Sequence, residues 1–454
     1  MPTPHAIGIH RRELLQIGYS GLLGVGLGGL LPRAATASSP AGTGEKRTPK
    51  SVILVFLTGA ASQLDTFDPK PDAPVEIRGE FKTIPTKIPG VQFGEHLPLL
   101  ADRADKLAVV RTLSHKDDNH TAATHHLITG AKQPGVRFDK PLSRDDWPCF
   151  AGGVSFLRPP GKGVPAGVTL PTFLGEGPLV WPGQHAGFLG PKFDPWQITK
   201  DPSKPDFRVE NVQLAAGLDI EQFNNRLALL DSVGKQQRAM AESLEGRRMT
   251  DQQKQAADML LSGAVSKAFE IDKEPAATRD KYGRHMFGQS LLLARRLVQA
   301  GVPMIQANMG RVQNWDSHSN NFNRLKKDLL PPLDKAVAAL LDDLGQSGLL
   351  DNTMVVVVGD FGRTPKVNKD QGGRDHWAPC FSGLFAGGGV RGGQVIGKSD
   401  KTASFPTTHP YSPDDVGATV YNLLGVDHTA EVRDRTNRPV QLNRGEVMSA
   451  LFTG

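Results

Sequence analysis

A short apolar run in the second half of the chain constrains the fold most strongly. Residues 354–358 read Met-Val-Val-Val-Val, and apolar residues at helical spacing precede them at Leu333, Val337, Leu340, Leu341 and Leu344. A continuous β-branched run is typical of a strand that is covered on both faces, and the preceding periodicity predicts a helix. A helix that leads directly into a buried strand indicates an α/β fold.

Carboxylates and imidazoles flank this helix–strand unit. Asp316 and His318 precede the helix, Asp360 follows the strand, and His376 lies in the next loop. Because ligands bind outside the carboxyl ends of strands in open α/β sheets, we expect these four side chains to converge. Asp/His sets of this kind suit Zn²⁺ or Mn²⁺. Two alternatives stay open: Asp316 as a helix cap and His376 as a hydrogen-bonded core histidine.

Four further apolar runs predict strands, over residues 52–57, 107–111, 302–306 and 381–386. With residues 354–358 they predict a central, mostly parallel sheet whose carboxyl ends share one edge. Helices are expected over 97–106, 219–274, 290–300 and 413–424, so the fold class is α/β with a sheet flanked by helices. Asp65 follows the first strand as a further candidate ligand.

The densest group of polar side chains follows the second predicted strand. It contains Ser114, His115, Asp117, Asp118, His120, His125 and His126. Adjacent residues point apart on a helix, so His125 and His126 do not easily line one site. A functional site and a solvated, histidine-rich loop are both compatible with this pattern.

The N-terminus has the features of an export signal. Arg11 and Arg12 precede an apolar, glycine-rich run over 17–31, and residues 35–37 read Ala-Thr-Ala. These features predict a twin-arginine signal peptide over 1–37 and a periplasmic or secreted protein with no stable membrane span after cleavage. The alternative is an uncleaved anchor, against which the glycines and the short run argue.

The rest of the chain is expected to form one domain. Residues 38–50 are rich in Ser, Pro, Gly and Lys and predict a linker, and residues 51–454 predict an α/β domain with a loop-rich and helical insertion around 131–280. A net charge of +6 over 454 residues without a basic block argues against nucleic acid as a partner. Cys149 and Cys380 are too few for a disulfide scaffold and are compatible with one bridge or two buried thiols.

Six longer strings are distinctive: Leu-Asp-Thr-Phe-Asp-Pro-Lys-Pro at 64–71, Tyr-Gly-Arg-His-Met-Phe-Gly-Gln at 282–289, Trp-Asp-Ser-His at 315–318, Phe-Gly-Arg-Thr-Pro-Lys at 361–366, Gly-Gly-Arg-Asp-His-Trp at 372–377 and Asp-Arg-Thr-Asn-Arg-Pro-Val at 434–440. These strings resemble a known family, the exported, sulfatase-like proteins catalogued as domain of unknown function 1501. The resemblance runs from about Ser51 to the C-terminus. It implies the alkaline phosphatase superfamily fold and a divalent-metal site at the strand ends.

The resemblance also implies an order of site residues along the chain. The implied metal ligands are Asp65, Asp316, His318, Asp360 and His376. Ser114 and Thr112 stand where the nucleophile is expected, and His115 is an equally good catalytic candidate there. Phe361 stands where the superfamily has the histidine of an Asp-His dipeptide, and no sulfatase Cys-x-Pro-x-Arg signature is present. One complete metal site is therefore expected rather than two.

Two functions follow from this reading. The first is a metal-dependent hydrolase of sulfate or phosphate esters, small or polysaccharide, with Zn, Mn or Ca as cofactor and with Arg363 or Arg374 holding the tetrahedral anion. The second is an exported binding or structural protein that keeps the fold without turnover. Metal content, followed by turnover of aryl sulfate and aryl phosphate, separates them.

Overall fold

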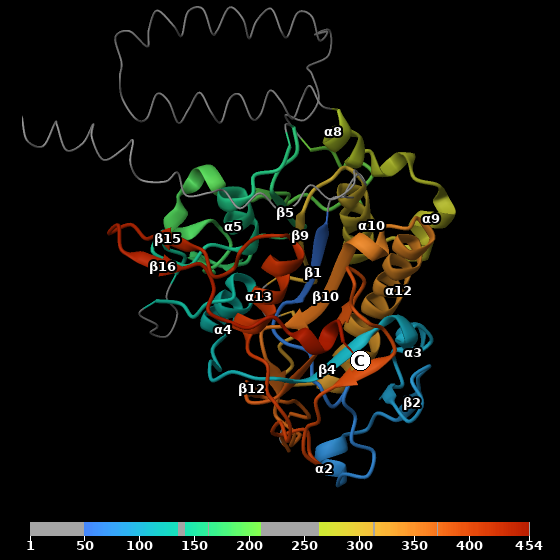
Figure 1. The fold of residues 1–454 in the computed structure, drawn as a ribbon. Coiled ribbons are helices and arrows are strands. Elements are labelled where there is room, and N and C mark those ends of the chain that lie inside the picture. The colour runs from blue at the N-terminus through green and yellow to red at the C-terminus, as the bar shows by residue number, and fades with distance from the viewer. Residues whose placement is uncertain are drawn as a thin grey trace, which may run out of the picture. The chain divides into compact units, whose positions relative to one another are not determined.

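An eight-stranded sheet forms the centre of the computed structural model (Figure 1). The model describes residues 50–134, 141–161, 163–209, 263–311, 314–369 and 371–453. Residues Pro49–Gly454 form one unit. The predicted signal peptide, almost all of the predicted linker and most of the predicted helix over 219–274 lie outside the described residues.

All five predicted strands belong to this sheet. Its order is β14-β4-β13-β10-β1-β9-β5-β8. The bounds are β1 (Ser51–Leu57), β4 (Ala108–Leu113), β5 (Gly167–Leu170), β8 (Trp196–Gln197), β9 (Met304–Asn308), β10 (Thr353–Gly359), β13 (Phe381–Ala386) and β14 (Gln394–Ile396). The central strand β1 pairs in parallel with β10 and β9, in a register that aligns Leu57 with Gly359 and Phe56 with Asn308. The predicted α/β class with a mostly parallel sheet is confirmed.

Strand β13 corrects one part of the prediction. It runs antiparallel to both β10 and β4, so its carboxyl end does not share the common edge. A parallel neighbour needs a crossover connection, usually through a helix. The described residues between β10 and β13 form loops and two short strands, β11 (Gly362–Arg363) and β12 (His376–Trp377). Phe381, at the start of β13, therefore lies at the edge where β4 ends, opposite Leu113.

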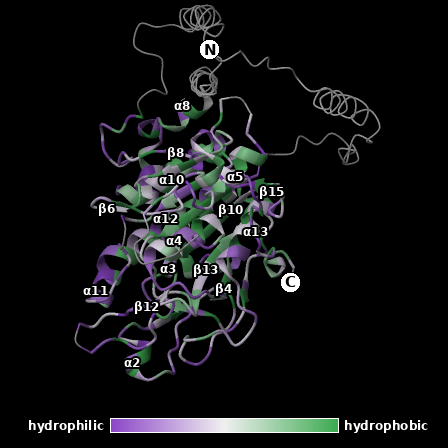
Figure 2. Ribbon diagram, turned by 90° about the vertical axis from the view of Figure 1, so that its left-hand side faces the viewer, coloured by the Kyte–Doolittle hydropathy of each residue, from purple (hydrophilic) through white to green (hydrophobic). Residues whose placement is uncertain are grey.

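Alternate side chains of β1 enter two separate hydrophobic cores, as the period of two in a strand requires. Ile53, Val55 and Leu57 pack on one face of the sheet. This face is covered by α3 (Pro98–Ala101), α8 (Ala264–Ala268), α10 (Met286–Gln299) and α12 (Leu330–Gln346). The opposite face is covered by α4 (His120–Thr129), α5 (Phe150–Leu157) and α13 (Pro413–Leu423). Figure 2 shows hydrophobic colours over the central strands and hydrophilic colours over α11 (Asn321–Arg324) at the periphery.

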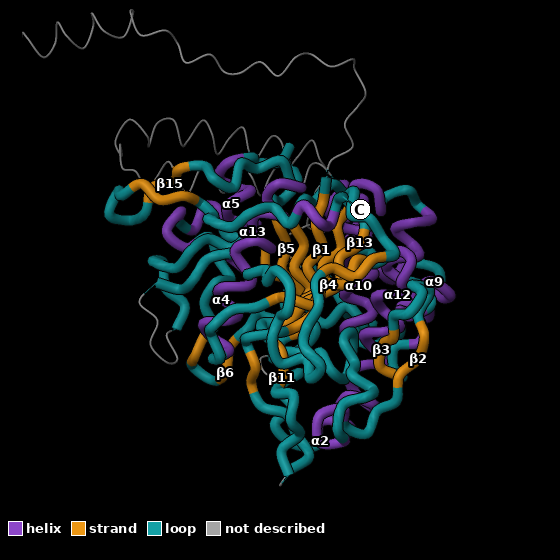
Figure 3. Tube along the Cα trace, turned by 60° about the horizontal axis from the view of Figure 1, so that its bottom comes forward, coloured by secondary structure: helices purple, strands orange, loops and turns teal. Residues whose placement is uncertain are grey.

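Shorter elements and loops lie beyond the carboxyl ends of the parallel strands, where Figure 3 shows β11 among loops. The remaining short strands are β2 (Thr83–Pro85), β3 (Gln92–Gly94), β6 (Gly175–Glu176), β7 (Leu179–Val180), β15 (Glu431–Arg433) and β16 (Pro439–Gln441). The remaining helices are α2 (Val75–Arg78), α9 (Ala276–Tyr282), the π-helical turn η5 (Leu325–Leu329) and the 3₁₀ turns η1 (Ala104–Lys106), η2 (Gly187–Leu189), η3 (Pro191–Phe193), η4 (Ile271–Lys273), η6 (Leu350–Asn352) and η7 (Ser449–Leu451).

Two smaller predictions also have an outcome in the structure. The helices expected over 97–106, 290–300 and 413–424 appear as α3 with η1, as α10 and as α13. Cys149 and Cys380 are both buried and unpaired, and burial raises the pKa of each thiol to about 12.

Within the described ranges, no helix combines the length and the apolar character needed to cross a bilayer.

Candidate metal centre

Four elements bring histidine and aspartate side chains together at the carboxyl edge of the sheet. Asp360 follows β10 directly, and Asp316 and His318 lie in the loop after β9. His376 begins β12, which pairs with β11 so that His376 stands opposite Arg363. His120 is the first residue of α4, where the Asn119 side chain accepts hydrogen bonds from two backbone N–H groups and fixes the helix start.

Asp316 is the centre of this group, which we call the central cluster (His120, Asp316, His318 and His376). Its Oδ1 lies 3.1 Å from His318 Nε2 and 3.5 Å from His376 Nε2, and its Oδ2 lies 3.3 Å from His120 Nε2. The Nε2 atoms of His318 and His376 are 3.1 Å apart. Two ligands bound about 2.1 Å from a tetrahedral ion lie roughly 3.4 Å apart. The three predicted ligands Asp316, His318 and His376 thus converge at spacings that an ion can bridge.

The outer nitrogen of each imidazole is held by an oxygen, which turns Nε2 inward. His120 Nδ1–H donates to Asp360 Oδ2 at 2.5 Å, and His318 Nδ1–H donates to Asp375 Oδ1 at 2.6 Å. His376 Nδ1–H donates to the backbone carbonyl of Asp118 at 2.6 Å. Hydrogen bonds of this kind fix the tautomer and orientation of metal-binding histidines. Asp360, predicted as a ligand, contacts the central cluster through His120.

The charges of the central cluster favour a cation at its centre. Burial would lower the pKa of His120, but the carboxylates of Asp360 and Asp316 raise it to about 9. Burial would raise the pKa of Asp316, but His120, His376 and the Arg363 guanidinium hold it well below its usual range. The two carboxylates therefore hold a positive charge at His120, and either a proton or a metal ion can supply it.

Two further observations show that the residues fit a metal ion. Among the described residues, His120 Nε2 and Asp360 Oδ1 are buried polar atoms without a hydrogen-bond partner, which is costly for a carboxylate oxygen. With Nδ1–H donating in both His318 and His376, the two facing Nε2 lone pairs repel each other unless a proton or a metal ion lies between them. Phe361 stacks on His120 at a ring-centroid distance of 4.6 Å and adds no ligand atom to the central cluster.

The structure places Asp65 away from the central cluster, in a buried ion pair. Its Oδ2 accepts from Arg374 Nε at 2.9 Å and from Asn321 Nδ2 at 2.9 Å, and its Oδ1 accepts from Arg374 Nη2 at 3.1 Å. Arg374 also donates to the carbonyls of Ile77, Thr364 and Pro365. Both side chains are fully buried. In this arrangement Asp65 and Arg374 bond to each other, and their roles as metal ligand and anion-binding group stay predictions.

Arg363 is likewise engaged within the protein. Its guanidinium donates to Asp316 Oδ1 and to the carbonyls of Gly59 and Ala60, and its side chain is fully buried. Its N–H groups face protein oxygens, and its role as the group that holds the anion stays a prediction. Arg363 orients Asp316 and ties the β1 loop to β11.

Ser114 and His115 follow β4 and line a hollow of about 630 Å³ with Lys116 and His376. Both ring nitrogens of His115 are hydrogen-bonded within the protein. His115 Nε2–H donates to the Asp360 carbonyl at 2.7 Å, and its Nδ1 accepts from Asp117 N–H at 3.1 Å. Burial, with the neighbouring His126, lowers the pKa of His115 to about 4, so it is neutral at pH 7. Ser114 and His115 both line the hollow, and their catalytic roles stay predictions.

His120 belongs to the central cluster but was not among the ligands predicted from the sequence. It belonged to the group of seven polar side chains after the second predicted strand, all of which were candidates. The signal that separates it is Asn119, a preferred N-cap residue, which puts His120 at the first turn of a helix pointing to the sheet edge.

The sequence of residues 49–452 matches the model of a family described as "Protein of unknown function (DUF1501)". The chain belongs to the DUF1501 family. This confirms the resemblance that the sequence strings indicated. A comparison with curated protein sequences found no match.

Three solved structures that are similar to this DUF1501 chain are described here. The protein Ps i-CgsB is 12% identical, with 89% of this chain and 76% of that chain covered and a TM-score of 0.42. The PsFucS1 sulfatase from Pseudoalteromonas sp. is 13% identical, with 92% and 72% covered and a TM-score of 0.38. A protein in the alkaline phosphatase superfamily from Vibrio parahaemolyticus is 11% identical, with 84% and 67% covered and a TM-score of 0.38. At these identities and scores the likeness assigns no function.

Proposed function

We propose that this DUF1501 chain is an exported, metal-dependent hydrolase of sulfate or phosphate esters. The observation that supports the proposal best is the central cluster, where three imidazole Nε2 atoms face one carboxylate beside an open hollow. His376 belongs to both the cluster and the wall of the hollow. A substrate in the hollow therefore lies next to the proposed ion.

The residues of the central cluster define the kind of ion. His120, His318 and His376 supply nitrogen and Asp316 supplies oxygen, a set that suits Zn²⁺ or Mn²⁺ better than Ca²⁺, which prefers oxygen ligands. A divalent ion held here supplies Lewis acidity to an ester oxygen and to water. Asp360, Asp375 and the Asp118 carbonyl keep the imidazoles aligned for it.

The hollow supplies the remaining parts of the proposed reaction. Ser114 lines it as the candidate nucleophile, and a water molecule is the alternative. Lys116 is exposed and lines the same hollow, so its ammonium can meet an anionic ester group. In this proposal Arg363 orients Asp316 and Arg374 pairs with Asp65, while Ser114 and Lys116 contact the substrate. A small ester and the end of a polysaccharide chain both fit the proposal.

Turnover by the metal-loaded protein tests the proposal. The metal-stripped chain is reloaded with Zn²⁺ or Mn²⁺ and assayed with aryl sulfate and aryl phosphate esters. We expect turnover of one ester class that disappears on metal removal and in the His376→Ala variant, and that persists in His409→Ala, an exposed histidine outside the cluster. Equal turnover by the parent and by His376→Ala would refute the proposed site.

The second candidate is an exported binding protein with the same fold and no turnover. Two observations favour it: both candidate anion-binding arginines are buried in protein contacts, and Phe361 replaces a ligand histidine. The same assay separates the two functions. A protein that binds metal stoichiometrically and turns over neither ester class is the binding protein.

Export rests on the N-terminal sequence alone. Arg11 and Arg12 before the apolar run support the twin-arginine route, which carries folded proteins. Replacing both arginines by lysine should leave precursor in the cytoplasm. Unchanged export points to the general secretory route, and an intact N-terminus on exported material argues against cleavage near Ser38.

A further inference from the structure

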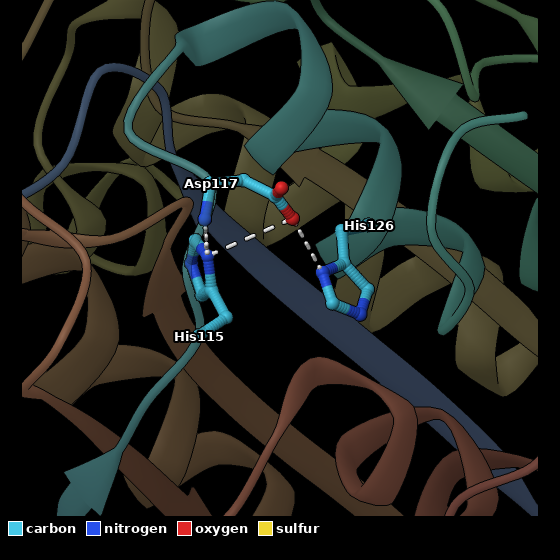
Figure 4. Close-up of side chains that lie close together, drawn as sticks. All are labelled: His115, Asp117 and His126. Atoms are coloured by element: carbon cyan, nitrogen blue, oxygen red, sulfur yellow. Dashed lines mark hydrogen bonds and ion pairs between the residues drawn. The ribbon is translucent and has the colours of Figure 1, made fainter. Parts of the chain in front are cut away.

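A second group of histidine and aspartate side chains lies next to the central cluster and takes no part in it. His115, Asp117 and His126, which we call the His126 cluster, each offer one ligand atom, and these atoms lie within 4.8 Å of one another. Figure 4 shows the two imidazoles on either side of the Asp117 carboxylate. His126 Nδ1 is 3.0 Å from Asp117 Oδ2, and His115 Nδ1 is 3.9 Å from the same oxygen.

Each imidazole of this cluster has its outer nitrogen engaged by an oxygen. His115 Nε2–H donates to the Asp360 carbonyl at 2.7 Å. His126 Nε2–H donates to Asp414 Oδ2 at 2.6 Å. In His115, the N–H of Asp117 donates to Nδ1, so the ring hydrogen is on Nε2 and the lone pair is on Nδ1. In His126, a carboxylate oxygen faces each ring nitrogen, so a single ring hydrogen satisfies only one of the two contacts. A carboxylate or carbonyl behind each imidazole is the arrangement that orients histidines toward a metal ion.

The contact between His126 and Asp117 needs a cation. With the hydrogen of His126 on Nε2, the Nδ1 lone pair meets a carboxylate oxygen only 3.0 Å away. Two acceptors at this distance repel, so either a second proton on the imidazole or an ion between the groups must be present. The separations of 3.0 and 3.9 Å lie on either side of the roughly 3.4 Å expected for two ligands on a tetrahedral ion.

We propose that His115, Asp117 and His126 form a second divalent-metal site, separate from the central cluster and suited to Zn²⁺. The two imidazole side chains are almost completely buried, and His115 lines the hollow through which an ion can enter. One contact has to give way: Asp117 N–H donates to His115 Nδ1 at 3.1 Å, and the ion replaces this bond.

The ion would join three parts of the fold. His115 and Asp117 lie in the loop after β4, His126 lies in α4, and Asp414 behind it lies in α13. The same Asp360 contacts both clusters, His115 through its carbonyl and His120 through its carboxylate. The ion therefore stabilises the loop and helix that carry His120 into the central cluster.

Metal counting on single-site variants tests this inference. The full-length chain is stripped of metal, dialysed against Zn²⁺ alone, and its bound metal is measured by mass spectrometry. We expect two equivalents in the parent, one in His376→Ala, one in Asp117→Asn and none in the double variant. His428→Ala, a histidine outside both clusters, should keep two. His126→Gln, which retains an amide for both carboxylates, serves as a second variant of the same site.

A thermal measurement supplies an independent readout. In the His376→Ala background, Zn²⁺ should raise the melting temperature, and in His376→Ala/Asp117→Asn it should not. The inference is overturned if the parent binds a single ion that only His376→Ala removes, or if Asp117→Asn and His126→Gln both keep two equivalents. Loss of metal in Asp117→Asn but not in His376→Ala supports the inference and counts against the proposed hydrolase site.

Discussion

The buried pair of Asp65 and Arg374 gives a prediction whose size follows from the structure. Both side chains are fully buried, and the Asp65 carboxylate accepts three hydrogen bonds, two from Arg374 and one from Asn321. The substitution Asp65→Ala leaves the guanidinium buried without its counter-charge. Removing one partner of such a pair costs about 3–5 kcal/mol. We expect Asp65→Ala to lower the free energy of unfolding by that amount.

The companion substitutions show whether the pair itself is responsible. Arg374→Met also removes donors to three backbone carbonyls, so it should cost at least as much as Asp65→Ala. In the double variant no unpaired charge remains. Its loss should fall short of the sum of the single losses by on the order of 1–3 kcal/mol.

Denaturant unfolding and metal content together make the assay. The matched control is Asp145→Ala, which breaks an exposed pair with Arg435 and should change stability by less than about 1 kcal/mol. All these variants should keep the metal of the central cluster. The reasoning is refuted if Asp65→Ala is as stable as the parent and loses its metal, because Asp65 would then be the ligand that the sequence suggested.

Three further predictions concern the site and the surface. Asp360→Asn weakens the hold on His120, so metal affinity measured by competition titration should fall about 10–100-fold, and unchanged affinity would contradict this role. Ser114→Ala should lower kcat for the ester by at least about 10³-fold with metal content unchanged, whereas near-parental kcat identifies water as nucleophile. Hydrogen bonds from Arg103 hold the pKa of Asp342 at about 2, below its ordinary value, so this pair stabilises the fold above about pH 4 and loses its effect as pH falls toward 2. The stability difference between the parent and Arg103→Ala in denaturant titrations should therefore shrink over that range, and a difference that grows would contradict the assignment.

The sheet was predictable where the strands are long and apolar. Residues 354–358 and 52–57 are buried on both faces of the sheet, so polar and apolar residues do not alternate in them. Such continuous apolar runs are compatible with few structures other than a buried strand. Strands β8 and β14 have two and three residues and carry too little pattern to be recognised. The direction of β13 was not predictable from its own residues, because it depends on the connection through the site loops.

For the candidate site, the sequence predicted which loops come together, but not which side chains contact one another. Residues that follow the parallel strands share an edge, and this rule brought Asp316, His318 and His376 together. The same rule included Asp65, whose partner Arg374 lies far away in sequence and becomes visible only in three dimensions. The surroundings of Arg363 and Arg374 were likewise not predictable. The sequence does not distinguish an arginine whose guanidinium is enclosed by backbone carbonyls from one that faces a substrate.

The most direct measurement of the central claim is a crystal structure of the Zn²⁺-loaded protein with anomalous data at the zinc edge. The account predicts an anomalous peak about 2.0–2.2 Å from the Nε2 atoms of His120, His318 and His376 and from an Asp316 oxygen. A structure of protein shown to contain zinc, with no peak among these four residues or with a peak bound by Asp65, would contradict it.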